Sequence, residues 1–286
     1  MTQFVSTAEG VRTACEVTGQ GAPLLLMHGA EASLRMFDAL VPLLARHFTV
    51  IAYDQRDCGA TESSPQPATL AELAHDALAL LQGLGFDRAH VFGSSFGGRV
   101  AQALAGLQPQ AVDRLVLGST WPLPHALAAL NPDGVQRIAE LRQHLPDSAP
   151  ELAQWFFPEA LMQAQPNLRN FFARVQPASE RSLRRARAVD STLALDWAVI
   201  TMPTLLLAGE LDLLVPCDVT LGMQAQLPQA QRVLLAGVGH ATALQAPESL
   251  AEHLIRFFTA DDTAIAACAA PHNAFPTAPQ PEEALP

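Results

Sequence analysis

The chain of 286 residues contains no lysine, since all 17 of its basic residues are arginine. That absence excludes enzymes that depend on a lysine, such as those that form a Schiff base, hold pyridoxal phosphate or bind phosphate through a P-loop. Cysteine is also scarce, and the four cysteines stand singly with no C-x-x-C pair. Such spacing does not suit a zinc site, so we expect a reduced protein without a metal or another cofactor.

Long apolar runs and a surplus of positive charge are missing as well. No stretch approaches the roughly 18 apolar residues of a membrane-spanning helix, and the N-terminus lacks the pattern of a secretory signal. The formal charge of −11 disfavours binding to phosphate backbones and anionic lipids. We therefore expect a cytoplasmic protein that acts on a small-molecule substrate, with no nucleic-acid or membrane partner; a homo-oligomer is left open.

Short apolar runs alternate with segments of helical pattern along most of the chain. Two short strands are expected within residues 1–20, around a turn at Glu9 and Gly10. Further strands are expected at residues 24–27, 49–53, 90–92, 114–117, 204–208 and 232–235, and helices at 33–46, 70–84, 96–107, 219–226 and 247–258. This alternation predicts an α/β fold: a mostly parallel, eight-stranded sheet with helices on both faces.

The alternation stops between residues 122 and 198, where the chain is helical in composition and rich in proline and arginine. We interpret this part as an inserted helical lid on a core of residues 1–121 and 199–259. Residues 260–286 are rich in alanine and proline and predict a disordered tail. Within the lid, the arginine run at residues 181–187 is expected to form a solvated helix face, with contact to an anionic substrate as the alternative.

The residues Gly93-Ser94-Ser95-Phe96-Gly97 match the pattern G-x-S-x-G between an expected strand and an expected helix. In this context the serine stands on a sharp turn as a nucleophile, and the glycines leave room for the neighbouring strand and helix. The alternative is a tight turn capped by serine. We predict that Ser95 is the nucleophile.

A serine hydroxyl needs a base that takes its proton, and the base needs an acid that orients it. His240 follows the last expected strand in a glycine-rich loop, at the sheet edge where ligands bind in open parallel sheets. Asp212 follows the preceding strand and is the predicted acid, with Glu210 as the second choice. The order of nucleophile, acid and base is the one expected for this fold. The other histidines considered lie in helices, strands or the tail: His75, His90, His144, His253 and His272.

Two backbone N–H groups should stabilise the oxyanion that forms during acyl transfer. One belongs to the residue after the nucleophile, Phe96, and the other is expected from Ala30 in the loop after the first buried strand. His28 is expected to shape that loop. Glu31 is the unusual neighbour, because a carboxylate there would oppose the oxyanion, so it is expected to face solvent or to bind a substrate cation. Further candidate substrate contacts are Trp121 and Trp155; the lid aromatics as a group are more typical of a packed core.

Taken together, these motifs resemble the α/β-hydrolase superfamily across residues 20–259. The matching segments are Leu25 to Gly29, Tyr53 to Gly59, Val91 to Gly98, Ala208 to Asp212 and Gly237 to His240. The stretch Asp54-Gln55-Arg56 and residues 203–258 look most like the branch of 3-oxoadipate enol-lactonases and prolyl-iminopeptidase-like hydrolases. The sequence departs from the family at Asp57, where a glycine is usual, and at Ala30-Glu31. Relatives that use an alkyl-enzyme route carry aspartate at the position of Ser95, so the resemblance excludes that route.

The resemblance implies a serine hydrolase that cleaves a small carboxylic ester or lactone through an acyl-enzyme on Ser95. A lid of roughly 75 residues favours a compact substrate. Hydrolysis of a C–C bond, a prolyl-iminopeptidase-like activity and cofactor-free perhydrolysis remain as alternatives with the same three residues. A non-catalytic binder on the same fold is the alternative from another class.

Overall fold

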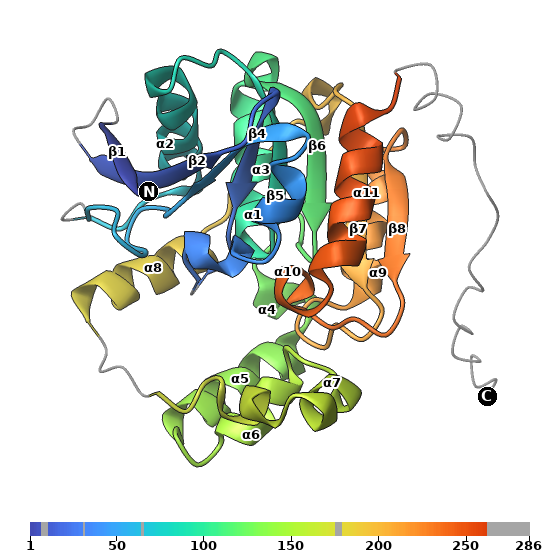
Figure 1. The fold of residues 1–286 in the computed structure, drawn as a ribbon. Helices are drawn as coiled ribbons and strands as arrows, with labels where there is room; N and C mark the ends of the chain where they lie inside the picture. Colours follow the sequence, from blue (N-terminus) through green and yellow to red (C-terminus); the bar gives the residue numbers. More distant parts are fainter. Residues whose placement is uncertain (7–10, 31, 64–65, 175–178, 262–286) are drawn as a thin grey trace, which may run out of the picture.

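The computed structural model describes residues 1–6, 11–30, 32–63, 66–174 and 179–261. It confirms the predicted fold class: one eight-stranded sheet, mostly parallel, with helices on both faces (Figure 1). The predicted turn at Glu9 and Gly10 and all but the first residues of the predicted tail lie outside the described residues. The strands are β1 (Gln3–Ser6), β2 (Arg12–Thr18), β3 (Ala22–Met27), β4 (Phe48–Tyr53), β5 (Ala89–Ser94), β6 (Val112–Gly118), β7 (Thr204–Gly209) and β8 (Gln231–Leu235).

The strands lie in the order β1-β2-β4-β3-β5-β6-β7-β8. The pairs β1–β2 and β2–β4 are antiparallel, and every other neighbouring pair is parallel. Because parallel strands end at the same edge of a sheet, the loops after β3, β5, β7 and β8 come together there. These loops carry the predicted oxyanion, nucleophile, acid and base residues.

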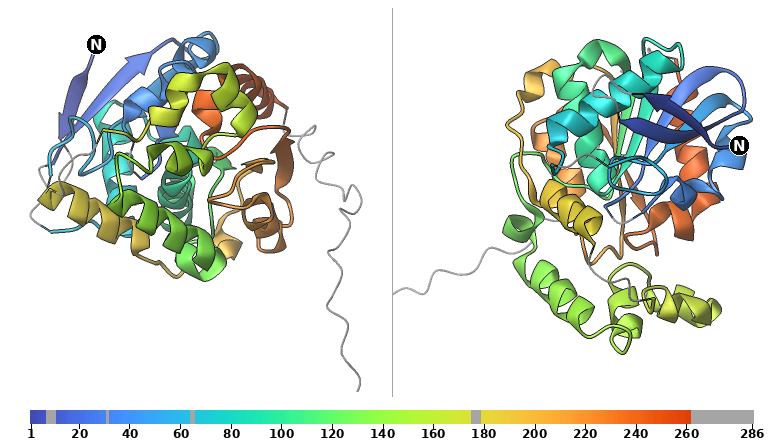
Figure 2. Two further views of the ribbon diagram at one scale, coloured as in Figure 1. Left: turned by 90° about the horizontal axis from the view of Figure 1, so that it is seen from below. Right: turned by 90° about the vertical axis from the view of Figure 1, so that its left-hand side faces the viewer.

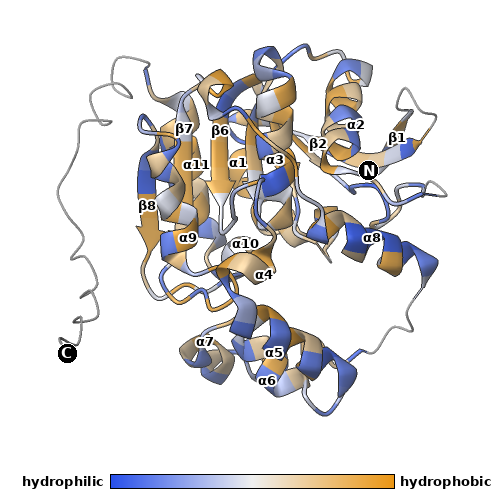
Figure 3. Cartoon of the chain, turned by 180° about the vertical axis from the view of Figure 1, so that it is seen from behind, coloured by the Kyte–Doolittle hydropathy of each residue, from blue (hydrophilic) through white to orange (hydrophobic). Residues whose placement is uncertain are grey.

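Helices cover the two faces of the sheet because successive strand residues point to opposite sides. In β3, Leu25 and Met27 pack in the cluster with α2, α3 and α9, whereas Leu24 and Leu26 pack in the cluster with α1 and α11. In Figure 3 the central strands are accordingly coloured as hydrophobic. The α-helices of the core are α1 (Val41–Leu44), α2 (Leu70–Gly83), α3 (Phe96–Leu107), α9 (Cys217–Gly222), α10 (Thr242–Gln245) and α11 (Pro247–Thr259), with short 3-10 helices η1 (Leu34–Phe37), η2 (Pro109–Ala111) and η5 (Met223–Ala225). A further 3-10 helix, η4 (Trp197–Val199), precedes β7.

The prediction of a single helix over residues 33–46 is wrong. The structure has the short η1 and α1 there instead, joined by a turn. Pro42 lies in the first turn of α1, and a proline inside a continuous helix would clash with the preceding turn. The Leu34 amide donates to the Asp54 carboxylate at 2.7 Å, which draws the start of η1 to the end of β4.

The segment between β6 and β7 contains α4 (Leu127–Leu130), α5 (Pro132–Gln143), α6 (Ala149–Gln154), α7 (Glu159–Ala164), η3 (Pro166–Asn170) and α8 (Glu180–Asp190). We call residues 122–198 the insert. Helices α5 to α7 project from the core as one group, while α8 lies apart from them against the core (Figures 1 and 2). Small apolar clusters around Leu152 and Phe157 hold the α5–α7 group together.

The two ends of the insert are tied to each other and to α3. The fully buried Arg99 of α3 donates from Nη2 to the Leu123 carbonyl at 2.7 Å and from Nη1 to the Val189 carbonyl at 3.0 Å. The Leu193 amide also donates to the Leu123 carbonyl, at 3.3 Å. Burial lowers the pKa of Arg99 to about 10. The insert therefore leaves and rejoins the core at one point.

Candidate active site

Ser95 stands on a tight turn between β5 and α3, with φ 55° and ψ −122°. A positive φ is strained for any residue with a side chain and is often found at functional positions. The turn is fixed because the Ser95 amide donates to the Gly118 carbonyl at 2.8 Å. The flanking glycines are required by space: a Cβ on Gly93 would lie 2.4 Å from the Gly97 oxygen, and one on Gly97 would lie 2.1 Å from the Met27 oxygen.

The structure brings the side chains of Ser95, His240 and Asp212 together in one hydrogen-bonded row. His240 Nε2 lies 3.0 Å from Ser95 Oγ, and His240 Nδ1 lies 2.8 Å from Asp212 Oδ2. The exposed fractions of the three residues are 9, 6 and 5%. When Asp212 is ionised it accepts from Nδ1–H, so the lone pair of Nε2 faces the serine hydroxyl.

Asp212 is held by backbone groups of its own loop. Its Oδ1 accepts from the Leu214 amide at 3.0 Å and from the Val215 amide at 2.8 Å, which leaves Oδ2 for His240. Glu210, the second choice for the acid, is exposed and accepts from the Gly237 amide at 2.9 Å. Of the two acids, Asp212 is therefore the one that contacts the imidazole of His240.

The other described histidines make different contacts. His90 stacks on Phe258 with ring centres 4.9 Å apart, and burial lowers its pKa. The Nδ1 atom of His144 lies 2.9 Å from the Glu140 carbonyl oxygen. His253 lies on α11 beside Arg256, and His75 is exposed on α2. His272 is outside the described residues.

The loop after β3, which carries Gly29 and Ala30, lies against Ser95. A Cβ built on Gly29 would be 3.6 Å from Ser95 Cβ. Phe96 is the first residue of α3, and the first N–H groups of a helix have no carbonyl partner within it. The backbone N–H groups of Ala30 and Phe96 are therefore candidates for the two oxyanion donors. Glu31 lies outside the described residues.

His28 holds the loop after β3 in place and is neutral. Its Nδ1 lies 2.7 Å from the Gly29 oxygen, and its Nε2 accepts from the Gln55 amide at 3.1 Å. Burial, with the nearby charge of Arg185, lowers the pKa of His28 to about 3. The proton is therefore on Nδ1, which donates to Gly29.

Three of the four arginines of the run in α8 do not form the solvated face that we expected, whereas Arg187 is exposed. Arg185 is 5% exposed, and Arg184 donates from Nη2 to the Asp57 carboxylate at 3.0 Å. Arg181 donates to the Cys58 and Thr61 carbonyls at 2.5 and 2.9 Å. The expectation failed because these acceptors lie more than 100 residues away in the chain. Figure 3 shows α8 as largely hydrophilic although it packs on the core.

Asp57, where the superfamily usually has glycine, has φ 64°. This is the left-handed region that glycine enters without strain and that aspartate tolerates better than most residues. The Asp57 side chain is only 2% exposed and forms an ion pair with Arg184, a partner that glycine would lack. The departure from the family motif thus keeps the backbone turn and adds a link to the insert.

The predicted substrate contacts lie in different surroundings. Trp121 is buried, and the Arg99 guanidinium carbon is 5.1 Å from its ring centre. Trp155 packs with the small cluster around Leu152 in the insert. The aromatic residue of the insert that meets the row of three residues is Phe156, whose ring centre lies 5.6 Å from that of His240. The sequence pattern does not distinguish Phe156 from its aromatic neighbours.

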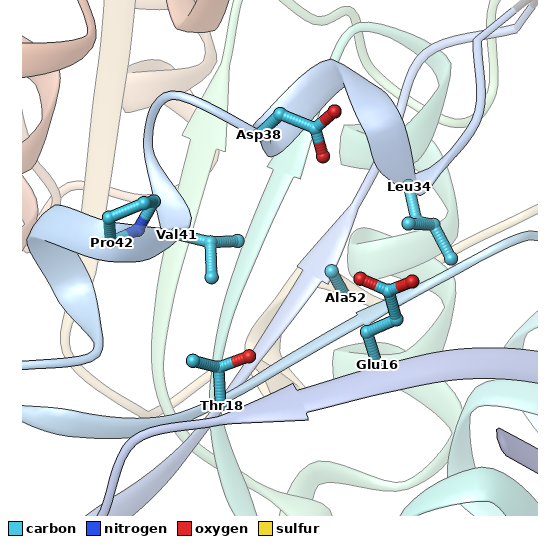
Figure 4. Close-up of a pocket in the computed structure, with 7 residues that line it drawn as sticks. All are labelled: Glu16, Thr18, Leu34, Asp38, Val41, Pro42 and Ala52. Atoms are coloured by element: carbon cyan, nitrogen blue, oxygen red, sulfur yellow. The ribbon is translucent and has the colours of Figure 1, made fainter. Parts of the chain in front are cut away.

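Figure 4 shows a separate pocket between β2, β4, η1 and α1. Two of its lining residues, Glu16 and Asp38, are paired with Arg35. None of its lining residues is Ser95, Asp212 or His240. Among the described residues no cluster of three histidine, cysteine or acidic side chains could hold a metal. Within the same residues no helix is long and apolar enough to cross a membrane.

A family model described as the alpha/beta hydrolase fold matches residues 22–247. The chain is 29% identical to a putative carbamate hydrolase RutD of Yersinia enterocolitica, over 88% of this chain and 94% of that protein. It is also 29% identical to a 2-hydroxymuconate semialdehyde hydrolase of Pseudomonas sp. strain CF600, over 87% of this chain and 89% of that one. A solved structure of a hydrolase from Pseudomonas aeruginosa superposes with a TM-score of 0.76 at 32% identity, covering 91% of this chain and 98% of that chain.

Proposed function

The chain belongs to the α/β-hydrolase fold family, and we propose that within it this hydrolase uses Ser95, His240 and Asp212 to cleave a small carboxylic ester or lactone. The observation that carries the proposal is the row of contacts at 3.0 and 2.8 Å that joins the three side chains. Separations within hydrogen-bond reach are what nucleophile, base and orienting acid require.

In the first half of the proposed reaction, Ser95 Oγ attacks the substrate carbonyl carbon and His240 Nε2 takes the hydroxyl proton. The carbonyl oxygen becomes an oxyanion, which accepts hydrogen bonds from the N–H groups of Ala30 and Phe96. When the intermediate collapses, the C–O bond to the alcohol breaks and His240 returns the proton to that alcohol. Asp212 stabilises the imidazolium throughout and stays ionised.

In the second half, water attacks the acyl-enzyme while His240 again accepts a proton. When the second tetrahedral intermediate collapses, the bond to Ser95 breaks, His240 returns the proton to Ser95 Oγ and the acid is released. With a lactone, alcohol and acid are parts of one product. The insert is the proposed lid: Phe156 against His240 supports an enclosed site, which suits a compact substrate.

The test combines labelling with turnover. A fluorophosphonate should label the wild type at Ser95, and Ser95→Ala should abolish labelling and lower kcat for p-nitrophenyl acetate by about 10⁶. Ser94→Ala is the matched control, because the Ser94 hydroxyl is buried one residue away, and it should keep labelling and turnover. A wild type that hydrolyses no acyl compound and takes no label would contradict the proposal and favour a binding protein.

Hydrolysis of a C–C bond is the second candidate, and the relative named 2-hydroxymuconate semialdehyde hydrolase supports it. The same nucleophile and base would act on a ketone carbonyl, and His240 would return its proton to the departing carbon in place of an alcohol oxygen. Comparing kcat/KM for p-nitrophenyl acetate, γ-butyrolactone and a 1,5-diketone separates the candidates. A diketone preferred by tenfold or more would replace the ester and lactone assignment.

A further inference from the structure

Arg185 is a buried cation that the insert places beside the loop after β3. Its Nε donates to the Ala30 carbonyl at 2.8 Å, and its Nη2 donates to Gln55 Oε1 at 3.1 Å. Both acceptors are neutral, and burial lowers the pKa of the guanidinium. Among the described residues no carboxylate pairs with Arg185, and an unpaired buried cation costs stability. A role in positioning the loop after β3 therefore explains the arrangement better than a contribution of the guanidinium to stability does.

The same guanidinium touches the second candidate oxyanion residue. Its carbon lies 4.4 Å from the centre of the Phe96 ring, a cation–π distance. Phe96 is fully buried, so its ring has little freedom to move away. One side chain of α8 thus contacts both residues whose N–H groups we assign to the oxyanion.

The contacts of Arg185 complete a set that fixes the peptide groups of the loop. In a trans peptide the C=O and N–H point in opposite directions, so the bond from His28 Nδ1 to the Gly29 oxygen sets the direction of the Ala30 N–H. Gln55 Nε2 donates to the His28 carbonyl at 2.5 Å, and Arg185 holds the other end of the Gln55 amide. Arg185 then fixes the next carbonyl, that of Ala30, directly.

We propose that Arg185 is a positioning residue for the oxyanion hole, so that the hole reaches its working geometry only when α8 is docked on the core. The inference rests on the proposed function, because it uses the oxyanion donors assigned there. It makes the insert a part of the rate-enhancing machinery in addition to a cover. No contact of Arg185 with the substrate is needed.

Arg184 is the matched control. It precedes Arg185 on α8 and also ties α8 to the core, through the carboxylate of Asp57. Its described contacts involve neither Ala30 nor Phe96. If α8 serves only to hold the fold together, Arg184→Met and Arg185→Met should have similar effects. If Arg185 positions the oxyanion hole, the two variants should differ in kcat.

The experiment measures kcat and KM for p-nitrophenyl acetate, the Ki of phenylboronic acid and the Tm of each variant. Loss of a single oxyanion donor costs about 10²–10³ in kcat, so Arg185→Met should lower kcat by about 10² with KM changed less than about threefold. Phenylboronic acid binds serine as a tetrahedral anion, so its Ki should rise in step with the fall in kcat. Arg184→Met should change kcat and Ki by less than about threefold. Arg185→Lys, which keeps the charge and one donor, should restore part of kcat.

Equal kcat values for Arg185→Met and Arg184→Met, or a lower Tm with an unchanged boronate Ki, would overturn the inference. If Arg185→Met does not fold, the Ki and kcat of Arg185→Lys decide: wild-type values contradict the inference. A wild type that labels at Ser95 while both arginine variants stay fully active defeats the inference alone. A wild type with neither labelling nor turnover defeats the proposed function, and the inference with it.

Discussion

The sheet edge and the insert both surround Ser95, but they are fixed by different kinds of bond. At the edge, backbone groups do the work: the Gly118 carbonyl holds the Ser95 turn, and two amides hold Asp212. The insert instead reaches the site mainly through side chains, namely the Phe156 ring and the Arg185 guanidinium, although the Phe156 carbonyl also accepts from the Ala241 amide at 3.4 Å. The path of the backbone therefore positions the site residues at the sheet edge. The site residues of the insert are positioned mainly by contacts between side chains. Substitutions at the edge should alter the rate of the chemistry, and substitutions in the insert should alter it less.

After Ser95→Ala, the largest effect is expected from Asp212→Asn. The change keeps the oxygen that accepts from the loop amides but removes the charge that orients the imidazole, so kcat should fall by about 10⁴ with little change in Tm. Steady-state kinetics with p-nitrophenyl acetate measures it. Glu210→Gln is the control and should stay within about threefold of wild type. A damaged Glu210→Gln beside an active Asp212→Asn would move the acid to Glu210.

Acidification should lower the stability of the folded protein through His28, which lies at the sheet edge. Its folded-state pKa of about 3 lies below the unfolded value of about 6.5. The unfolded chain therefore takes up the proton first, and the free energy of unfolding falls as pH falls through the window from about 6.5 to 3. Between pH 7 and pH 5 this loss should be about 2 kcal/mol.

Urea unfolding at the two pH values measures that loss in the wild type and in His28→Gln. The variant should be less stable at pH 7 but should lack the His28 part of the decline. The exposed His75 supplies a control, since His75→Gln should decline as the wild type does. Identical declines in the wild type and His28→Gln would show that His28 does not stay neutral in the folded protein.

A smaller effect is expected from Phe156→Ala in the insert. Aromatic ring pairs contribute about 0.5–1.5 kcal/mol, so kcat/KM for p-nitrophenyl butyrate should fall about three- to tenfold, mainly through KM. Phe171→Ala is matched in chemistry, but its ring is 50% exposed, and it should leave kcat/KM unchanged. If kcat fell a thousandfold with KM constant, the insert would share the role assigned to the edge.

The smallest effect should come from ending the chain at Ala260. The tail contains few large apolar residues to bury, so we expect it to pack against neither the sheet edge nor the insert. Differential scanning calorimetry should find Tm within about 5 °C of the full chain, and kcat should be unchanged. A larger drop would mean that the tail packs on the folded chain.

The same difference explains what could be predicted from sequence. Ser95, Asp212 and His240 each follow a strand, and a parallel sheet brings strand ends together whatever the intervening sequence. Arg185 and Phe156 could not be selected in this way, because their partners are fixed by tertiary packing. Arg185 lies on a helix whose polar composition looks solvated, and Phe156 lies in the turn between α6 and α7 next to other aromatic residues. The missed break between η1 and α1 has a local sign, Pro42, and a distant cause, the Asp54 carboxylate that binds the Leu34 amide.

Arg99 has a consequence for protein engineering. Because it binds the insert through the backbone carbonyls of Leu123, His125 and Val189, and every residue supplies a carbonyl, we expect the segment between Leu123 and Val189 to be exchangeable on the same core. A chimera carrying the equivalent segment of a relative should retain this anchor and acquire a different substrate chamber. It would lose Arg185, however, unless the donor segment supplies an arginine at the same turn of its last helix. Chimeras should therefore be chosen by that arginine before they are chosen by the shape of the chamber.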